Sequence, residues 1–164
     1  MSSTGLIKTY HDNDFLKEEY YQINNKKEGL YKKYLSNGQL FIICNYNDGK
    51  KNGEYICYYD NSLINKSISY EQIFIICNYI DDIENGEHIS YHSNGQINII
   101  CNYIDGKING EFKSYHINGQ LKTICNYING KEIGMKDQPI LYGEFKSYHE
   151  NGQLNIICNY IDGK

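Results

Sequence analysis

Polar and hydrophobic side chains alternate in a short block that recurs along the chain, and this period of two is typical of β-strands. The block reads Gln-Leu-x-Ile-Ile-Cys-Asn-Tyr, so that Leu, the first Ile, Cys and Tyr share one face. A second β-prone run, Gly-Glu-Phe-Lys-Ser-Tyr-His, precedes the block and is joined to it through Asn-Gly. Asn-Gly between two such runs predicts a β-hairpin with a type I′ turn, in which both central residues have positive φ. The predicted turn residues are Asn37, Gly38, Asn94, Gly95, Asn118, Gly119, Asn151 and Gly152.

The hairpin is the unit of an internal repeat with a basic period of 24 residues. Its first Gly recurs at steps of 24, 24, 33, 24 and 33 residues, so two insertions of nine residues interrupt the period. The insertions run from about Asp60 to Ser69 and from Gly134 to Tyr142. The repeats begin at Gly5, Gly29, Gly53, Gly86, Gly110 and Gly143. Hairpins in series predict an all-β fold, an elongated antiparallel sheet of about six tandem hairpin repeats that is twisted or trough-like. We expect a single domain over residues 1–164.

A Tyr stands five residues after the first Gly in every copy of the repeat. With a two-residue turn, the residue two places after that Gly lies opposite Cys, and this Tyr lies on the other face of the sheet. Tyr provides amphipathic contact area at low entropic cost and is enriched at protein interfaces, which makes the row a candidate binding face. Packing of the same rings within the sheet is the alternative. The candidate residues are Tyr34, Tyr58, Tyr91, Tyr115 and Tyr148.

The recurring string Gly-Glu-Phe-Lys-Ser-Tyr-His-x-Asn-Gly-Gln-Leu, followed by Tyr-Ile-Asp-Gly-Lys-x-x-Gly, resembles the MORN-repeat variant. The resemblance covers roughly residues 5–164 and is carried by five clear copies in register. It implies a module for protein interaction, membrane association or structural support. The same repeat type also occurs in a bacterial family of antitoxins.

Six cysteines invite a disulfide or metal hypothesis, and five of them share one position in the repeat. Equivalent cysteines of neighbouring repeats are two strands apart, about 9.6 Å, whereas a disulfide needs Cα atoms within about 7 Å. We therefore expect a ladder of packed thiols. A Cys44–Cys57 disulfide is the alternative, because Cys57 falls across from Cys44 if the linker turn is centred near Gly49-Lys50-Lys51.

Four histidines, His11, His92, His116 and His149, stand beside the predicted hairpin turns. They lie roughly 13 Å along the strand from the Cys row, too far for a shared zinc site. A His92–His116 pair would still need two further ligands, so a polar rim at the turns is the favoured interpretation and no metal or other cofactor is expected. Residues such as Ser114 and Glu111 recur in other copies, whereas a catalytic site is normally one asymmetric place. We therefore expect no enzyme activity.

The amino-acid composition limits the classes of partner and the cellular location that we expect. The net charge of −4 argues against nucleic acid, and the 16 basic residues are all Lys, which lack the planar fork of Arg. Heavy use of Ile, Asn, Lys and Tyr leads to the hypothesis of an A/T-rich source such as a giant DNA virus. The N-terminus lacks the apolar core of a signal peptide and no apolar run approaches 18 residues, so a cytoplasmic location is expected, in the host if the source is viral.

The favoured function is therefore a non-enzymatic repeat scaffold that binds an unidentified protein partner. Peripheral association with a membrane surface through Lys-bearing turns is a weaker alternative, and antitoxin-like neutralisation of a partner protein is a third. Unpaired edge strands would also allow end-to-end self-association.

Overall fold

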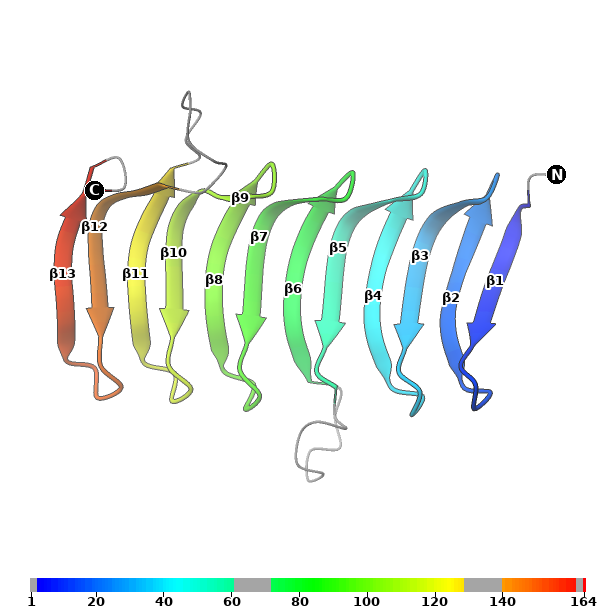
Figure 1. Cartoon of the computed structure of the whole chain (residues 1–164), viewed down its shortest axis with the longest axis horizontal. Coiled ribbons are helices and arrows are strands. Elements are labelled where there is room, and N and C mark those ends of the chain that lie inside the picture. The colour runs from blue at the N-terminus through cyan, green and yellow to red at the C-terminus, as the bar shows by residue number, and fades with distance from the viewer. Residues whose placement is uncertain (1–2, 61–71, 129–139, 162–163) are drawn as a thin grey trace. The chain divides into compact units, whose positions relative to one another are not determined.

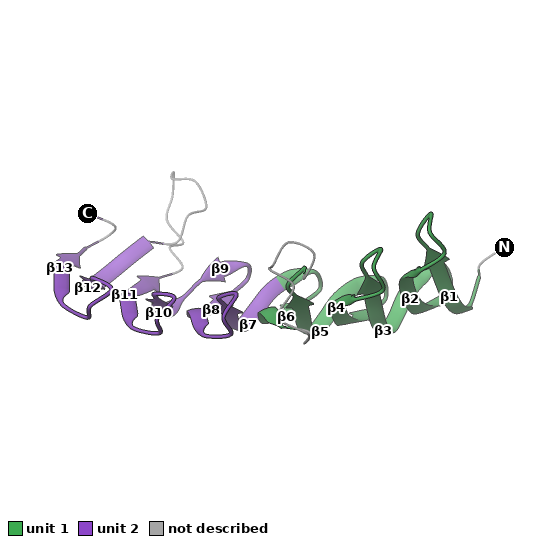
Figure 2. Cartoon of the chain, turned by 90° about the horizontal axis from the view of Figure 1, so that it is seen from below, with its two compact units in different colours: residues 1–83 green, residues 84–164 purple. Residues whose placement is uncertain are grey.

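A computed structural model of the chain describes residues 3–60, 72–128, 140–161 and 164. These residues form thirteen β-strands and no helix, which confirms the all-β class (Figure 1). Nothing in this part of the chain is a helix long and apolar enough to cross a membrane. The chain divides into two compact units, residues 1–83 and residues 84–164, coloured separately in Figure 2. A single domain over the whole chain stays a prediction.

The first unit is an antiparallel sheet in which the strands pair in chain order. Its strands are β1 (Gly5–Tyr10), β2 (Leu16–Ile23), β3 (Lys26–Tyr34), β4 (Leu40–Asn47), β5 (Lys50–Tyr58) and β6 (Ile73–Ile80). Each predicted repeat of this unit is one hairpin, β1–β2, β3–β4 or β5–β6.

The second unit repeats the same plan, with strand order β7-β8-β10-β11-β12-β13 and the short β9 paired to β8. Its strands are β7 (Ile83–Tyr91), β8 (Ile97–Ile104), β9 (Lys107–Ile108), β10 (Gly110–Tyr115), β11 (Leu121–Ile128), β12 (Ile140–Tyr148) and β13 (Leu154–Tyr160). The tandem-hairpin prediction is thereby confirmed for all six repeats. The predicted insertions fall mainly on residues 61–71 and 129–139, which lie outside the described residues.

The predicted register holds in the middle of each hairpin, where Tyr31 lies opposite Cys44 and Lys33 opposite Ile42. It fails beside the loop, because a bulge after Lys33 pairs Tyr34 with Leu40. The extra residue of this bulge, Phe41, is on β4, so the bulge turns Leu40 and not Tyr34 to the other face of the sheet. Tyr34 keeps the alternation of β3 and lies on the face opposite to Cys44, as predicted, whereas the prediction that Leu40 shares the face of Cys44 is wrong. The same bulge precedes Tyr10, Tyr58, Tyr91, Tyr115 and Tyr148.

The turn types also differ from the prediction. Gly38 has a φ of 85°, but Asn37 is absent from the residues with positive φ, so the Asn-Gly turn is not type I′. Leu35 N donates to Gln39 O at 2.8 Å and Gly38 N donates to Leu35 O at 2.9 Å, which makes a three-residue loop ending in a left-handed Gly. The turns with two positive φ values are the linkers, as at Asp48 (49°) and Gly49 (84°).

The most buried side chains all point to one face of the sheet in each unit. We call it the cysteine face; the buried residues are Tyr31, Cys44, Cys57, Cys77, Ser90, Cys101 and Cys125. Side chains of adjacent strands crowd together on this face, so the core is a row of packed thiols and rings within a single layer. The packed Cys row was predicted, and Cys44, Cys101 and Cys125 are each less than 5% exposed.

Cys57 does not lie across from Cys44, so the predicted alternative of a disulfide between them is wrong. A register shift in the linker hairpin places Tyr55 opposite Cys44 and Cys57 opposite Ile42. Both cysteines carry free thiols. The shift accompanies Gly53, whose φ of 93° is a conformation that L side chains rarely adopt.

Candidate binding surface

Tyrosine rings line the linker end of the cysteine face in the first unit. The Tyr20 and Tyr31 centroids are 6.0 Å apart, and those of Tyr31 and Tyr46 are 5.4 Å apart. On the next hairpin the Tyr55 and Tyr79 rings meet edge to face at 5.5 Å. Cross-strand pairing sets Tyr20 opposite Tyr31. It sets Tyr46 and Tyr79 opposite Gly29 and Gly53, whose lack of a side chain leaves room for the rings.

Two lysine ammonium groups lie over these rings. Lys27 Nζ is 4.2 Å from the Tyr31 centroid, 4.7 Å from that of Tyr20 and 5.2 Å from that of Tyr46. Lys51 Nζ is 4.5 Å from the Tyr79 centroid and 5.8 Å from that of Tyr55. These are cation–π distances, each worth about 0.5–1 kcal/mol at exposed sites. We call Lys27, Lys51 and the rings of Tyr20, Tyr31, Tyr46, Tyr55 and Tyr79 the Lys–Tyr band.

Strand register decides which lysines reach this face. Lys27 lies opposite Gln22 and Lys51 opposite Tyr46, both on the cysteine face. Their chain neighbours Lys26 and Lys50 lie opposite Ile23 and Asn47 and point to the other side, as alternation along a strand requires.

Charge is segregated between the faces of the first unit. Among its described residues, the charged side chains of the cysteine face are Lys27, Lys33, Lys51 and Glu18. Glu18 accepts a hydrogen bond from the Tyr31 hydroxyl at 2.8 Å. No carboxylate in the described part of the chain lies within ion-pair distance of Lys27 or Lys51.

Two lysines on the other side of the first unit, Lys8 and Lys26, have carboxylate partners. Lys8 lies 3.2 Å from Glu19, and Lys26 lies 2.7 Å from the turn residue Asp48. The two ammonium groups of the Lys–Tyr band thus form no ion pair in the described part of the chain, although the carboxylates of Asp82 and Glu18 lie near the band and raise the pKa of Tyr46.

Burial raises the pKa values of the Tyr and Cys side chains of the band, which are neutral at pH 7. It raises the pKa of Tyr46 to about 12 and, together with the hydrogen bond to Glu18, raises the pKa of Tyr31 further. Burial also raises the pKa of the Cys44 thiol to about 11, although the nearby Lys51 and Lys27 oppose the shift. The charged groups at and around this surface are therefore the lysines and the carboxylates of Glu18 and Asp82.

The second unit has a different surface at the corresponding positions. Ile108 and Leu141 lie opposite Tyr103 and Tyr127, as Lys51 lies opposite Tyr46. Rings still pair there: Phe112 with Tyr127 at 5.8 Å, and Phe145 with Tyr160 at 6.0 Å.

The second unit also carries an acidic group where the first has Lys27 and Lys51. Glu84 Oε1 contacts His88 Nδ1 at 2.5 Å, and His88 takes the position that Tyr31 has in the first unit. The cysteine face of this unit therefore shows a carboxylate and no lysine among its described residues.

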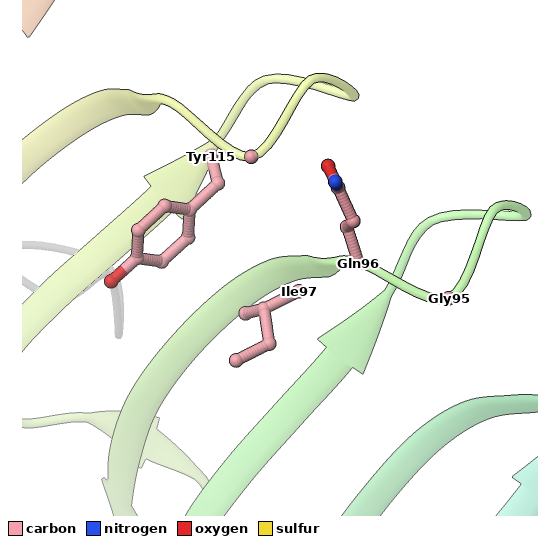
Figure 3. A pocket seen from close by; sticks show the side chains of 5 residues that line it. Gly95, Gln96, Ile97 and Tyr115 are labelled. Carbon is pink, nitrogen blue, oxygen red and sulfur yellow. The ribbon is translucent and has the colours of Figure 1, made fainter.

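The predicted Tyr row lies at the hairpin-loop end of the strands, on the face opposite to Cys. Tyr115 is half-buried and lines an open depression with Gly95, Gln96, Ile97 and Gly119 (Figure 3). Its ring lies on the same side of the sheet as Ile97 of the preceding hairpin. The structure therefore brings each such Tyr beside an aliphatic residue and leaves part of the ring accessible, which is compatible with both roles predicted for the row.

The predicted polar rim of histidines links successive hairpins. His11 Nε2 donates to the Tyr34 carbonyl at 2.9 Å, and His92 and His116 donate in the same way to Tyr115 and Tyr148. The loop asparagines add a second link, since Asn118 Nδ2 donates to the Glu150 carbonyl at 2.8 Å. These side chains join one loop to the next, which explains why they recur in the sequence.

Sequence reasoning missed Lys27, Lys51 and His88 as members of a surface. A weak signal was present, because Lys stands two residues before the repeat Gly in two consecutive copies. Its meaning depends on the register shift in the linker hairpin, which a period of two does not reveal.

A family model described as the MORN repeat variant matches residues 27–48, 84–105, 108–129 and 141–162. Each matched segment corresponds to one hairpin, and together they cover 88 of the 164 residues. The hairpins β1–β2 and β5–β6 share the fold without being matched. The search of curated proteins gave no match. On the matched repeats and the hairpin architecture, the chain belongs to the MORN-repeat variant family.

Proposed function

We propose that this chain is a non-enzymatic scaffold that binds a protein partner through the cysteine face. MORN repeats are generally associated with binding to proteins and membranes, which sets the broad class of function. The observation that carries the finer proposal is the Lys–Tyr band, where Lys27 and Lys51 lie over tyrosine rings without an ion-pair partner among the described residues. Half-buried rings and unneutralised charge are typical of surfaces completed by a partner.

The state of the reactive side chains supports binding over catalysis. A cysteine nucleophile needs a lowered pKa, whereas burial raises the pKa of Cys44 and of Cys101 to about 11. The Nε2 atoms of His11, His92 and His116 each donate to a backbone carbonyl, so that nitrogen is not available as a base.

Adjacent tyrosines on β2 allow a matched test. Tyr20 lies opposite Tyr31 on the cysteine face, whereas Tyr21 lies opposite Glu28 on the other face and is 44% exposed. We expect Tyr20→Ala to abolish recovery of a partner from an extract of the source cell and Tyr21→Ala to leave it intact. Circular dichroism must show that both variants fold. Equal recovery with both variants, or loss with Tyr21→Ala alone, would place the binding surface elsewhere.

Membrane association is the second candidate, and the exposed isoleucines beside the linker turns favour it. Ile80 is 53% exposed beside the acidic turn Asp81–Asp82, and Ile104 is 39% exposed beside the turn that precedes Lys107. An apolar residue next to a Lys-bearing turn, as at Ile104, is a pattern that interfacial segments use. Flotation on anionic vesicles separates the two proposals: the scaffold proposal predicts that the protein stays at the bottom of the gradient. Strong flotation that high salt abolishes would contradict it.

A further inference from the structure

We infer that the Lys–Tyr band of the first unit receives an acidic, extended segment of a partner protein in the polyproline II conformation. The inference rests on the proposed function, because it names the chemistry of the partner at the same surface. It is carried by charge complementarity and by the spacing of the lysines.

Charge restricts where an acidic segment can bind. The chain as a whole has a net charge of −4, yet the strands of the first unit carry three lysines and one glutamate on the described part of the cysteine face, with Asp82 at the linker turn beside Lys51. That glutamate, Glu18, already accepts the Tyr31 hydroxyl. An acidic segment is therefore repelled by most of the molecule and attracted to this surface.

The rings hold the two ammonium groups in place. Three rings surround Lys27 Nζ and two lie near Lys51 Nζ, so each ammonium is positioned without a carboxylate of this chain. An ammonium held in this way loses little side-chain freedom when a ligand carboxylate arrives, which favours binding by preorganisation.

Spacing selects the conformation of the ligand. Lys27 on β3 and Lys51 on β5 occupy equivalent positions two strands apart, which corresponds to about 9.6 Å. A polyproline II helix repeats every three residues, about 9.3 Å. Two turns of an α-helix advance about 10.8 Å, and side chains on one face of a β-strand repeat at about 6.7 Å. Carboxylates at every third residue of a polyproline II segment match the lysines best.

The tyrosines suit the same ligand. A polyproline II segment makes no internal hydrogen bonds, so its carbonyl groups need outside donors, and its flat proline faces pack on aromatic rings. Tyr20 and Tyr46 are half-buried and flank Lys27, and each offers a ring face and a hydroxyl. Apolar contact and hydrogen bonding therefore lie on the line defined by the two lysines.

Binding of a short peptide of Glu-Pro-Pro repeats to the full chain tests this inference, measured by isothermal titration calorimetry. We expect saturable binding that the double variant Lys27→Gln/Lys51→Gln weakens by about tenfold or more. The matched control is Lys26→Gln/Lys50→Gln, which removes the same charge from adjacent residues of the other face and should change affinity by less than about twofold. If the first double variant unfolds, Lys51→Gln alone should still weaken binding.

A second peptide tests the spacing separately from the charge. An alternating Glu-Pro peptide with the same number of carboxylates should bind several-fold more weakly than the Glu-Pro-Pro peptide. Equal binding of the two peptides, or equal loss in the two double variants, would overturn the inference. Binding to anionic vesicles without binding to the peptide would overturn it as well and would favour a membrane surface.

Failure of this inference is distinguishable from failure of the proposed function. If the Glu-Pro-Pro peptide does not bind but recovery of a natural partner still depends on Tyr20 and not on Tyr21, the scaffold function stands and the partner has another chemistry. If recovery is independent of Tyr20, the proposed function itself falls.

Discussion

The two units use one backbone plan to present two different surfaces. In both, hairpins pair in chain order, the loop bulge precedes the recurring Tyr, and buried thiols form the centre of one face. At the linker end of that face the first unit has Lys27 and Lys51 over tyrosine rings, whereas the second has Ile108 and Leu141. The backbone plan that the units share depends on recurring glycines, turns and buried thiols. A few positions between these residues determine the charge and polarity of the surface.

We expect the largest difference in stability between variants of the two units at the aromatic residue that lies opposite Cys. Tyr31 is 6% exposed and donates to Glu18, whereas its counterpart Phe112 is half-buried and has no hydroxyl. Truncation of a buried ring removes packing and leaves a cavity, so Tyr31→Ala should lower the free energy of unfolding by about 3–5 kcal/mol. Phe112→Ala should cost about 2 kcal/mol. Urea unfolding followed by circular dichroism measures both, and equal losses would contradict the difference in packing.

The buried thiols should make both units less stable at high pH. Burial raises the pKa of Cys44 and Cys101 from 9.0 to about 11, so in the folded state these thiols stay protonated after the unfolded chain has lost its protons. Their stabilising contribution is complete below pH 9 and declines as pH rises from about 9 to 11, by up to about 2 kcal/mol per thiol. Urea unfolding at pH 8.0 and pH 10.5 measures the decline.

The charges around Cys44 of the first unit differ from those around Cys101 of the second unit. Lys51 and Lys27 lower the pKa of Cys44 against the effect of burial, whereas Glu84 raises that of Cys101. Removing the two lysine charges should therefore raise the pKa of Cys44 further, so that its loss of stability still begins near pH 9 but continues to higher pH and becomes larger. A stability that is unchanged between pH 8.0 and pH 10.5 would refute the account of the buried thiols.

Replacing the glycine of the linker bulge should lower the free energy of unfolding equally in both units, because this bulge belongs to the backbone plan that the two units share. Gly53 and Gly110 have φ values of 93° and 88°, and a Cβ at either would meet no atom within 4 Å. The cost of Gly53→Ala or Gly110→Ala is then backbone strain alone, about 1–2 kcal/mol. Asn tolerates the left-handed region better, so Gly53→Asn should cost less. A large difference in stability between the two Ala variants in urea unfolding would mean that the linker bulges of the two units are not equivalent.

We expect the smallest effect on stability at the hydrogen bonds that join the loop of one hairpin to the next hairpin. His11 and His116 each donate to the carbonyl of the following hairpin at 2.9 Å. Loss of one such hydrogen bond by His11→Ala or His116→Ala should cost about 1 kcal/mol in either unit. The exposed Glu54→Ala serves as the control and should be nearly neutral in the same thermal unfolding assay.

The sequence was sufficient for the repeat, the hairpins and the packed Cys row because each is expressed by residues that recur at fixed spacing. It was insufficient for the face on which Leu40 lies and for the positions of Lys27 and Lys51. Both depend on bulges, and a bulge adds a residue without changing the alternation of polar and apolar side chains. Asn-Gly likewise fits two loop types, and the three-residue loop is the one observed.

Zero-length carbodiimide cross-linking of the Glu-Pro-Pro peptide to the full chain, read by mass spectrometry, tests the central claim most directly. The reagent joins a carboxylate to a lysine amine in contact with it. We expect the cross-links to concentrate at Lys27 and Lys51, with little product at the adjacent Lys26 and Lys50, which point to the other face. Cross-links spread evenly over these four lysines, or concentrated in the second unit, would contradict the claim that the Lys–Tyr band is the binding surface.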